Sequence, residues 1–239
     1  MMHWIEHSLD RFFPPVASSY GGEIDFVFSF VFWIVVAFWF MLVQGAFLYL
    51  VLRYRKRDGV RAQHITGYTT TEHRWIAWPH YVIILCDILI VAAAIRVWYN
   101  VKQDLPPADA TVRIVAQQWA WSFVHPGPDG KLDTPDDIRT VDDLHLEVGK
   151  NYHYLLEARD VLHSLSIPVF RLKQDAIPGR VVTGWFKPTV TGEHDIQCAE
   201  ICGIGHGLMP GRVFLETPEE HAAWMAAHAV TPETPPAGE

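Results

Sequence analysis

Two long apolar stretches dominate the first hundred residues of this 239-residue chain, and shorter stretches rich in β-branched and aromatic residues dominate the rest. The first apolar stretch, residues 26–52, carries no charge, and Gln44 is the one polar residue well inside it. The second runs from Trp75 to Trp98. About 20 apolar residues suffice to span a bilayer, and tryptophans often mark the two interfaces. The pattern predicts a transmembrane helical hairpin over residues 26–98.

The polar segments around these stretches predict the orientation of the hairpin. A basic cluster at residues 53–57, followed by Arg61, comes directly after the first stretch, and a polar connection fills residues 62–74. Basic residues beside a span favour the cytoplasmic side, so both termini and residues 99–239 are expected on the outer face. Residues 1–25 form an amphipathic lead, in which Pro14 and Pro15 end any helix. This lead lacks the features of a secretory signal and is expected to lie on the membrane surface or to contact another subunit.

Two ionisable residues interrupt the second span, Glu72 just before its start and Asp87 within it. Asp87 lies near its middle, where a charge costs about 2.5–3.5 kcal/mol on insertion scales. It therefore faces a protein partner in the membrane, or it is neutral or hydrogen-bonded within the hairpin. Its neighbour Cys86 is expected to be a small buried hydrophobe.

From Thr111 onward, the residue pattern becomes typical of short strands. After a linker at residues 99–110, segments such as TVRIVAQQWAWSF, LHLEV, NYHYLLEA, GRVVTGWF, GEHDIQC and GRVFLET are bounded by Gly, Pro and Asp. Such spacing predicts an all-β sandwich or barrel over residues 111–217. Trp119 and Trp121 flank Ala120, so in one continuous strand they would project from the same face. Trp121 is expected in the core.

Two further segments complete this part of the chain. An aspartate-rich insert at residues 126–143 is either an acidic surface hairpin or a site for a hard cation such as calcium, although its spacing does not match an EF-hand loop. The tail, residues 218–239, begins with a predicted helix, PEEHAAWMAAHAV, and ends in a Pro- and Glu-rich stretch.

The net charge of −8 is distributed unevenly. Residues 99–239 contain 20 acidic and 11 basic residues, whereas residues 1–98 contain 7 and 8. An acidic outer domain would speed the encounter with a basic soluble partner, or would only keep the domain soluble. Nucleic acid is not an expected partner of such a surface. At 50% hydrophobic residues, the chain is too apolar to be disordered.

The most specific chemistry lies between Cys198 and Met209. This loop contains two cysteines, a histidine and a methionine, and it is rich in glycine. Thiolate, thioether and imidazole together are typical of copper electron-transfer sites, and the second thiolate would allow more than one metal ion to be bridged. A further nitrogen ligand is needed, for which His163 is the best candidate. The alternative is a disulfide between Cys198 and Cys202, which would not explain the following His206 and Met209.

Several blocks resemble subunit II of haem–copper cytochrome c oxidases. They are CAEICGIGHGLMPG, VLHSLSIP, RLKQDAIPGR, QQWAWSF and the Glu72-His-Arg-Trp75 pattern, which occur in the family's order and cover most of residues 26–216. The resemblance implies a cupredoxin Greek-key domain that holds the dinuclear copper centre CuA. It implies Cys198 and Cys202 as bridging thiolates, and His163 and His206 as terminal ligands. Met209 and the Glu200 carbonyl would be weak ligands, and the Glu200 side chain would share a magnesium or manganese ion with subunit I.

The same resemblance implies the functional context. Trp119 would be the point where electrons arrive from a soluble cytochrome c, and Glu72 would be the mouth of a proton pathway into subunit I. The Lys173, Asp175 and Arg180 block would lie near subunit I, and subunit III is a further expected partner. The expected location is the bacterial inner membrane. Within subunit I, oxygen would be reduced and protons pumped.

Three alternatives remain open at this point. A quinol oxidase subunit II shares the fold but has typically lost the copper ligands, which are all present here. The chain could instead serve a nitric oxide or nitrous oxide reductase, or it could be a copper store or chaperone. No Cys-x-x-Cys-His motif occurs, so no covalent haem c is expected.

Overall fold

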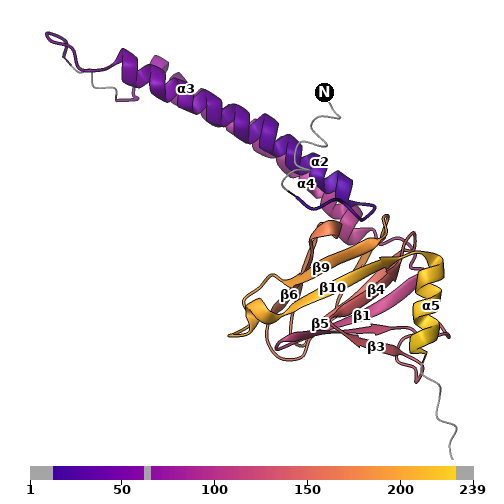
Figure 1. The fold of residues 1–239 in the computed structure, drawn as a ribbon. Coiled ribbons are helices and arrows are strands. Elements are labelled where there is room, and N and C mark those ends of the chain that lie inside the picture. Colours follow the sequence, from indigo (N-terminus) through magenta and orange to yellow (C-terminus); the bar gives the residue numbers. More distant parts are fainter. Residues whose placement is uncertain (1–12, 62–65, 230–239) are drawn as a thin grey trace, which may run out of the picture. The chain divides into compact units, whose positions relative to one another are not determined.

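The computed structural model describes residues 13–61 and 66–229 of the chain, which divide into two compact units. One unit contains the helices of residues 25–99, and the other combines residues 10–24 with residues 100–239. Two apolar helices are followed by a β-domain, which confirms the fold class expected from the sequence (Figure 1).

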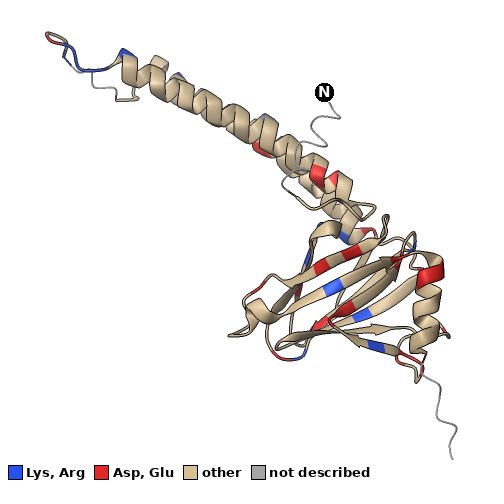
Figure 2. Cartoon of the chain, viewed as in Figure 1, with Lys and Arg blue, Asp and Glu red and all other residues tan. Residues whose placement is uncertain are grey.

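The first long helix begins five residues earlier than the apolar pattern suggests. It consists of α2 (Gly21–Phe30), a π-helical stretch η1 (Val31–Ala37) and α3 (Phe38–Arg53). The second consists of α4 (Thr70–Trp98) and the short π-helix η2 (Tyr99–Gln103). Both runs are long and apolar enough to cross a membrane. Figure 2 shows ribbon coloured blue for Lys and Arg at the end of α3; in the sequence, Arg53 is followed there by the basic residues 55–57.

The β-domain consists of two five-stranded sheets. The first has the order β3-β2-β1-β5-β8 and the second the order β4-β10-β9-β6-β7. Most neighbours are antiparallel, but β1 pairs with β5 and β10 pairs with β4 in parallel, as connections that cross between sheets require. The strands are β1 (Ala110–Gln117), β2 (Ala120–His125), β3 (Ile138–Val141), β4 (Asp143–Glu147), β5 (Tyr152–Ala158), β6 (His163–Ile167), β7 (Leu172–Ala176), β8 (Val182–Phe186), β9 (Gly192–Cys198) and β10 (Pro210–Glu216).

The core of this domain follows from the period-2 alternation of its strands. In β5 every second residue is buried, and Tyr154 and Leu156 are almost fully enclosed. The opposite sheet contributes Leu144, Leu165 and Ile196, each with no exposed surface. Alternate side chains of a strand point to opposite faces, so this pattern closes one apolar layer between the two sheets.

The segment around Trp119 corrects the expectation of one continuous strand. β1 ends at Gln117 and β2 begins at Ala120, so Gln118 and Trp119 form a hairpin turn, with Gln117 opposite Ala120. Trp119 and Trp121 consequently do not share a face: Trp121 is fully buried, and 37% of Trp119 is exposed. The turn contains neither Gly nor Asn, the residues from which a tight turn is usually predicted. The side chain of Asp160 stabilises it by accepting a hydrogen bond from Gln118 N at 2.7 Å.

Residues 13–20, which we call the N-terminal strap, pack on the β-domain. Ala17 N donates to Val169 O at 2.8 Å, and Thr189 N donates to Ala17 O at 2.9 Å. The buried Tyr20 ring meets Trp185 edge-on, with their centroids 5.1 Å apart. The strap is therefore part of this domain. Residues 1–12 of the expected amphipathic lead lie outside the described residues.

The acidic insert and the tail helix lie in the same domain. Within the insert, Asp133 binds Arg113 through both carboxylate oxygens, and Asp136 accepts from Asp129 N at 3.2 Å and from the Thr134 hydroxyl at 2.6 Å. These aspartates are thus engaged with protein donors. The predicted tail helix is present as α5 (Pro218–His228), which begins at a capping box formed by Thr217 and Glu220.

Candidate metal centre

Two strands and one loop bring the predicted ligands together. His163 is the first residue of β6, and Cys198 is the last residue of β9. These two strands are neighbours (Figure 1), and Leu165 lies opposite Cys198, so the register places His163 just beyond the point where the chain leaves β9. The loop then returns through Cys202 and the 3-10 turn η4 (His206–Leu208) to Met209, immediately before β10.

The donor atoms lie at distances that suit a shared metal site. The Sγ atoms of Cys198 and Cys202 are 3.8 Å apart. Nδ1 of His163 lies 3.9 Å from the first sulfur, and Nδ1 of His206 lies 3.5 Å from the second. Each thiol therefore has one imidazole nitrogen close to it. Among the described residues, His163, Cys198 and Cys202 form the one group of three or more potential ligands whose donor atoms converge.

The sulfur geometry differs from that of a disulfide. A covalent S–S bond is about 2.05 Å long, and both thiols are free here. Burial and the neighbouring Cys198 thiol raise the pKa of Cys202 to about 11. Without a cation, this thiol stays protonated at neutral pH, whereas a bound metal ion would favour the thiolate.

Asp160 positions the buried His163 ring. Its carboxylate lies 2.9 Å from His163 Nε2, which leaves Nδ1 directed at Cys198. Burial acts to raise the pKa of Asp160, but hydrogen bonds from Gln118 N, His163 and Val161 N outweigh it and hold the pKa below its usual value. A carboxylate behind a histidine is the usual arrangement at metal ligands, where it fixes the tautomer and the ring orientation.

Trp119 is in direct contact with the loop from Cys198 to Met209, which we call the metal loop. Its indole Nε1 donates to the carbonyl of Cys202 at 3.2 Å, and Gln118 Nε2 donates to the same oxygen at 2.8 Å. A Cβ atom on Gly205 would lie 2.4 Å from the indole ring, and Gly203 has φ +119°. Both positions therefore need glycine, because the loop backbone passes directly against the ring.

The remaining predicted ligands lie in the same loop. Met209 is buried, and its carbonyl accepts a long hydrogen bond of 3.4 Å from the Trp121 indole. The carbonyl oxygen of Glu200 lies 3.3 Å from Cys198 Sγ, and the Glu200 side chain is half-buried. All six predicted metal ligands are thus contributed by β6, the end of β9 and the loop up to Met209.

Glu72 lies in the other compact unit, and the structure gives it a local role. It is the third residue of α4, where its carboxylate accepts from Gly67 N at 3.1 Å and Thr69 N at 3.4 Å. Thr69 in turn caps the Glu72 amide. This capping box starts the second apolar helix and is compatible with a further role for the carboxylate.

The donor set fits copper better than the alternatives. Zinc sites use Cys, His and carboxylates, whereas two thiols, two imidazoles and a buried thioether are soft enough for copper. Sequence reasoning missed two residues that support this set, Asp160 and Gln118. Asp160 could have been found from its position, because it is a carboxylate three residues before a candidate histidine ligand. The neighbouring sequence does not indicate a supporting role for Gln118.

Comparison with known proteins gives the family. The profile described as cytochrome C oxidase subunit II, periplasmic domain, matches residues 129–215. The alternative cytochrome c oxidase subunit 2 of Bradyrhizobium diazoefficiens is 34% identical over 88% of this chain and 82% of its own length. The cytochrome c oxidase subunit 2 of Thermostichus vulcanus is 31% identical over 92% of this chain and 79% of its own.

A solved structure is also similar to part of this chain. The crystal structure of the periplasmic domain of subunit II of cytochrome oxidase from Bradyrhizobium japonicum is 31% identical, with a TM-score of 0.47, and covers 52% of this chain and 96% of that one. The sequence relationship over most of both chains is decisive. This protein belongs to the cytochrome c oxidase subunit II family.

Proposed function

We propose that this chain is the subunit that receives electrons from cytochrome c and passes them to haem in subunit I of a respiratory oxidase. The observation that carries the proposal is the pair of free thiols 3.8 Å apart, with His163 close to one sulfur and His206 close to the other, in a domain of this family. Oxygen reduction and proton pumping belong to the partner subunit. As an oxidase component, the chain is part of an oxidoreductase.

The residues of the loop would hold a dinuclear copper centre. Cys198 and Cys202 would bridge, His163 and His206 would complete the two ends, and Met209 and the Glu200 carbonyl would bind weakly. Copper in such a site supplies one-electron exchange. Burial of His163, Cys202 and Met209 excludes water, and the rigid sheets on either side limit rearrangement of the ligands.

Trp119 is the proposed point where electrons arrive. Part of its ring is exposed, and its N–H is bonded to a carbonyl of a proposed copper ligand. The acidic balance of the outer domain would attract a basic cytochrome c and speed its encounter. Because the hydrogen bond joins the surface to the ligand loop without an intervening side chain, Trp119 is the best-placed aromatic residue for this role.

The placement in the membrane rests on the two apolar helices and on the strap. Residues 13–20 pack on the same domain as residues 110–216, so the chain between them returns to the side on which it started. Two crossings satisfy this requirement. The basic cluster after α3 supports a cytoplasmic connection, with the β-domain on the periplasmic side of the bacterial inner membrane.

The remaining roles concern partner subunits. Glu72 would be the mouth of a proton pathway into subunit I, and the half-buried Glu200 side chain would share a magnesium or manganese ion at the boundary with that subunit. Lys173, Asp175 and Arg180 would form part of the same boundary. Subunit III would complete the assembly.

The test is copper analysis with electron paramagnetic resonance on the full chain in detergent. The full chain is needed because a fragment that starts after the hairpin would lack the strap. Two coppers per chain that share one unpaired electron are expected, and Cys198→Ser is expected to abolish this signal. Cys86→Ser is the matched control, because this cysteine lies in α4. A mononuclear blue-copper signal, or copper that chelators remove readily, would contradict the proposal and favour a carrier.

A further inference from the structure

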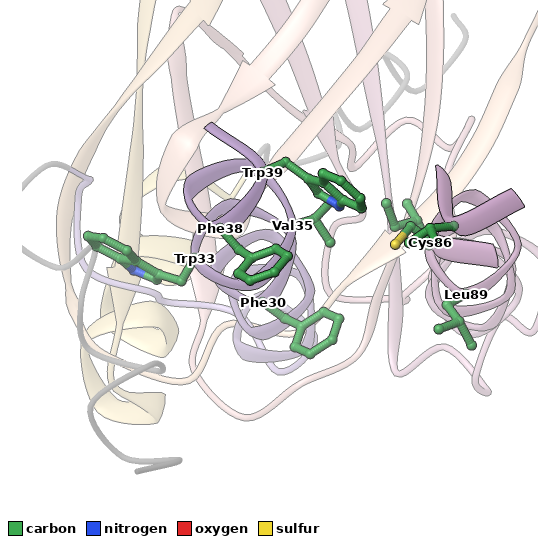
Figure 3. A pocket seen from close by; sticks show the side chains of 9 residues that line it. Phe30, Trp33, Val35, Phe38, Trp39, Cys86 and Leu89 are labelled. Atoms are coloured by element: carbon green, nitrogen blue, oxygen red, sulfur yellow. The ribbon is translucent and has the colours of Figure 1, made fainter. Parts of the chain in front are cut away.

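The two apolar helices leave a cavity of about 500 Å³ between them, which Phe30, Phe38, Trp39 and Cys86 help to line (Figure 3). All of its lining residues are uncharged, so nothing in the lining selects one apolar ligand over another. The ionisable side chains that pack together outside the metal loop lie in the β-domain instead, where α5 covers the sheets.

Four histidines lie around the Trp224 ring of α5, and we call them the histidine cluster. His145 of β4 stacks on the indole with the ring centroids 4.2 Å apart, and His125 of β2 stands nearly perpendicular to it at 5.0 Å. The rings of His221 and His228, both on α5, have their centroids 5.6 Å and 5.1 Å from it. Because β2 and β4 belong to different sheets, this one side chain of α5 contacts both sheets of the domain.

Two members of the histidine cluster share a carboxylate. Nδ1 of His145 and Nδ1 of His221 lie 2.7 Å and 2.8 Å from the two oxygens of Glu216 on β10. Each ring therefore donates through Nδ1, and a proton taken up at the other ring nitrogen brings a positive charge next to a negative one. These two contacts consequently strengthen in acid and favour the docked position of α5.

His125 has no such partner. Only 2% of this residue is exposed, and its Nε2 makes no hydrogen bond with the described residues. Burial, followed by the neighbouring His145 and His221, holds its pKa at about 3. The titratable groups on the elements packed around it are His145 of β4, Glu216 of β10, and His221 and His228 of α5, and its partner on β3, Ile138, is apolar. Since Glu216 is engaged by two other rings, a proton on His125 has no anion to stabilise it while α5 shields it from solvent.

α5 is the element beside His125 that can move without disrupting a sheet. It has 11 residues, none of them buried, and isolated helices shorter than about 12–15 residues are marginal in water. The sheets have a core of their own, to which Leu144 and Leu156 belong. Segments with few buried contacts open locally with less free energy than global unfolding requires. Undocking of α5 is therefore the local opening that brings His125 into contact with solvent.

We propose that α5 is an acid-released latch: proton uptake by His125 detaches the helix from the β-domain, while the two sheets stay paired. The released state binds this proton near pH 6.5, as an exposed histidine does, whereas the docked state excludes it. Release is therefore disfavoured above that pH and increasingly favoured below it. The Glu216 contacts oppose release, so we expect the ratio of released to docked helix to rise by about five- to twentyfold between pH 7 and pH 5. The latch requires neither copper nor a partner subunit, so it does not depend on the proposed function.

Hydrogen exchange of the full chain in detergent measures release, with mass spectrometry at pH 7 and pH 5 and correction for the intrinsic effect of pH on exchange. Protection of the α5 amides is expected to fall by about five- to twentyfold at pH 5. At both pH values it should stay well below the protection of β5, which opens only when the domain unfolds. His125→Phe keeps an aromatic ring against Trp224 but binds no proton, so it should make α5 protection equal at the two pH values. His228→Gln, at the exposed end of α5, is the matched control and should behave as the wild type.

Trp224→Ala is a second variant that does not depend on the folding of His125→Phe. It removes the ring that all four histidines contact, so α5 should be weakly protected at pH 7 as well as at pH 5. The proposal is overturned if wild-type α5 is equally protected at both pH values, if its amides are as strongly protected as those of β5, or if either His125→Phe or Trp224→Ala retains the full acid effect.

Discussion

The indole Nε1 of Trp119 donates a hydrogen bond of 3.2 Å to the carbonyl of Cys202, so a half-exposed side chain and a buried proposed metal ligand are joined by a single contact. This contact exists because β1 and β2 turn back at Gln118 and Trp119. In a continuous strand, the indole would have been carried into the core beside Trp121. The hairpin thus places an aromatic ring between solvent and the metal loop.

Replacement of Trp119 tests this arrangement. Trp119→Phe keeps a ring against Gly205 but removes the N–H donor, so we expect slower reduction of the site by cytochrome c with unchanged copper content. Trp119→Ala should also destabilise the domain by about 1–3 kcal/mol, because it removes a large half-buried side chain. Stopped-flow reduction and thermal unfolding measure the two effects. Unchanged reduction kinetics in both variants would exclude Trp119 as the point of electron arrival.

Asp160 is expected to control metal affinity without touching the metal. Asp160→Asn is expected to weaken the hydrogen bond to His163 Nε2. Loss of such a contact behind a metal ligand typically lowers the metal affinity by about 10–100-fold. Competition with a copper chelator measures this change. Asp175→Asn, on the neighbouring strand β7, is the control. Equal affinity in the Asp160 and Asp175 variants would show that His163 does not depend on its carboxylate.

Two substitutions of Glu72 separate its structural role from a role in proton uptake. Glutamine can still close the capping box but cannot carry a proton, so Glu72→Gln should preserve assembly and lower oxidase turnover. Glu72→Ala also removes the capping box and should lower the stability of the first turn of α4 by about 0.5–2 kcal/mol. Oxygen consumption by the complex and hydrogen exchange at the start of α4 distinguish the two. Normal turnover with glutamine would restrict Glu72 to capping.

His125 is expected to make the β-domain acid-sensitive. Burial, followed by the neighbouring His145 and His221, lowers the pKa of His125 to about 3, and its Nε2 has no partner among the described residues. In the unfolded chain, His125 takes up a proton near pH 6.5. The contribution of neutral His125 to the free energy of unfolding is therefore complete above that pH, and it is lost as the pH falls toward 3. At pH 5 the loss amounts to about 2 kcal/mol.

Thermal unfolding of the full chain in detergent, followed by near-ultraviolet circular dichroism at pH 7 and pH 5, measures this loss. His125→Phe keeps an aromatic ring against Trp224, whose centroid lies 5.0 Å away, and should flatten the difference between the two pH values. His228→Gln, on the exposed end of α5, should leave it unchanged. An equal acid effect in the wild type and His125→Phe would assign the sensitivity to other groups.

The sequence predicted the parts of the molecule that depend on periodicity or on ligand chemistry. The two apolar helices, the β-domain, the tail helix and the convergence of His163, Cys198 and Cys202 were all accessible in this way. The turn at Trp119 was not, because Asp160 stabilises it from 42 residues away. The strands β3, β6 and β7 were missed for a related reason, because long-range pairing fixes their limits.

The strap has a consequence for biosynthesis. Its residues leave the ribosome before either apolar helix, yet Val169 and Thr189, which bond it, are made more than a hundred residues later. The helical hairpin is thus an insertion within a discontinuous domain. The β-domain can close around Tyr20 only after both apolar helices and the strands that follow them have been made. Completion of the fold therefore reports that the whole helical hairpin has already been synthesised.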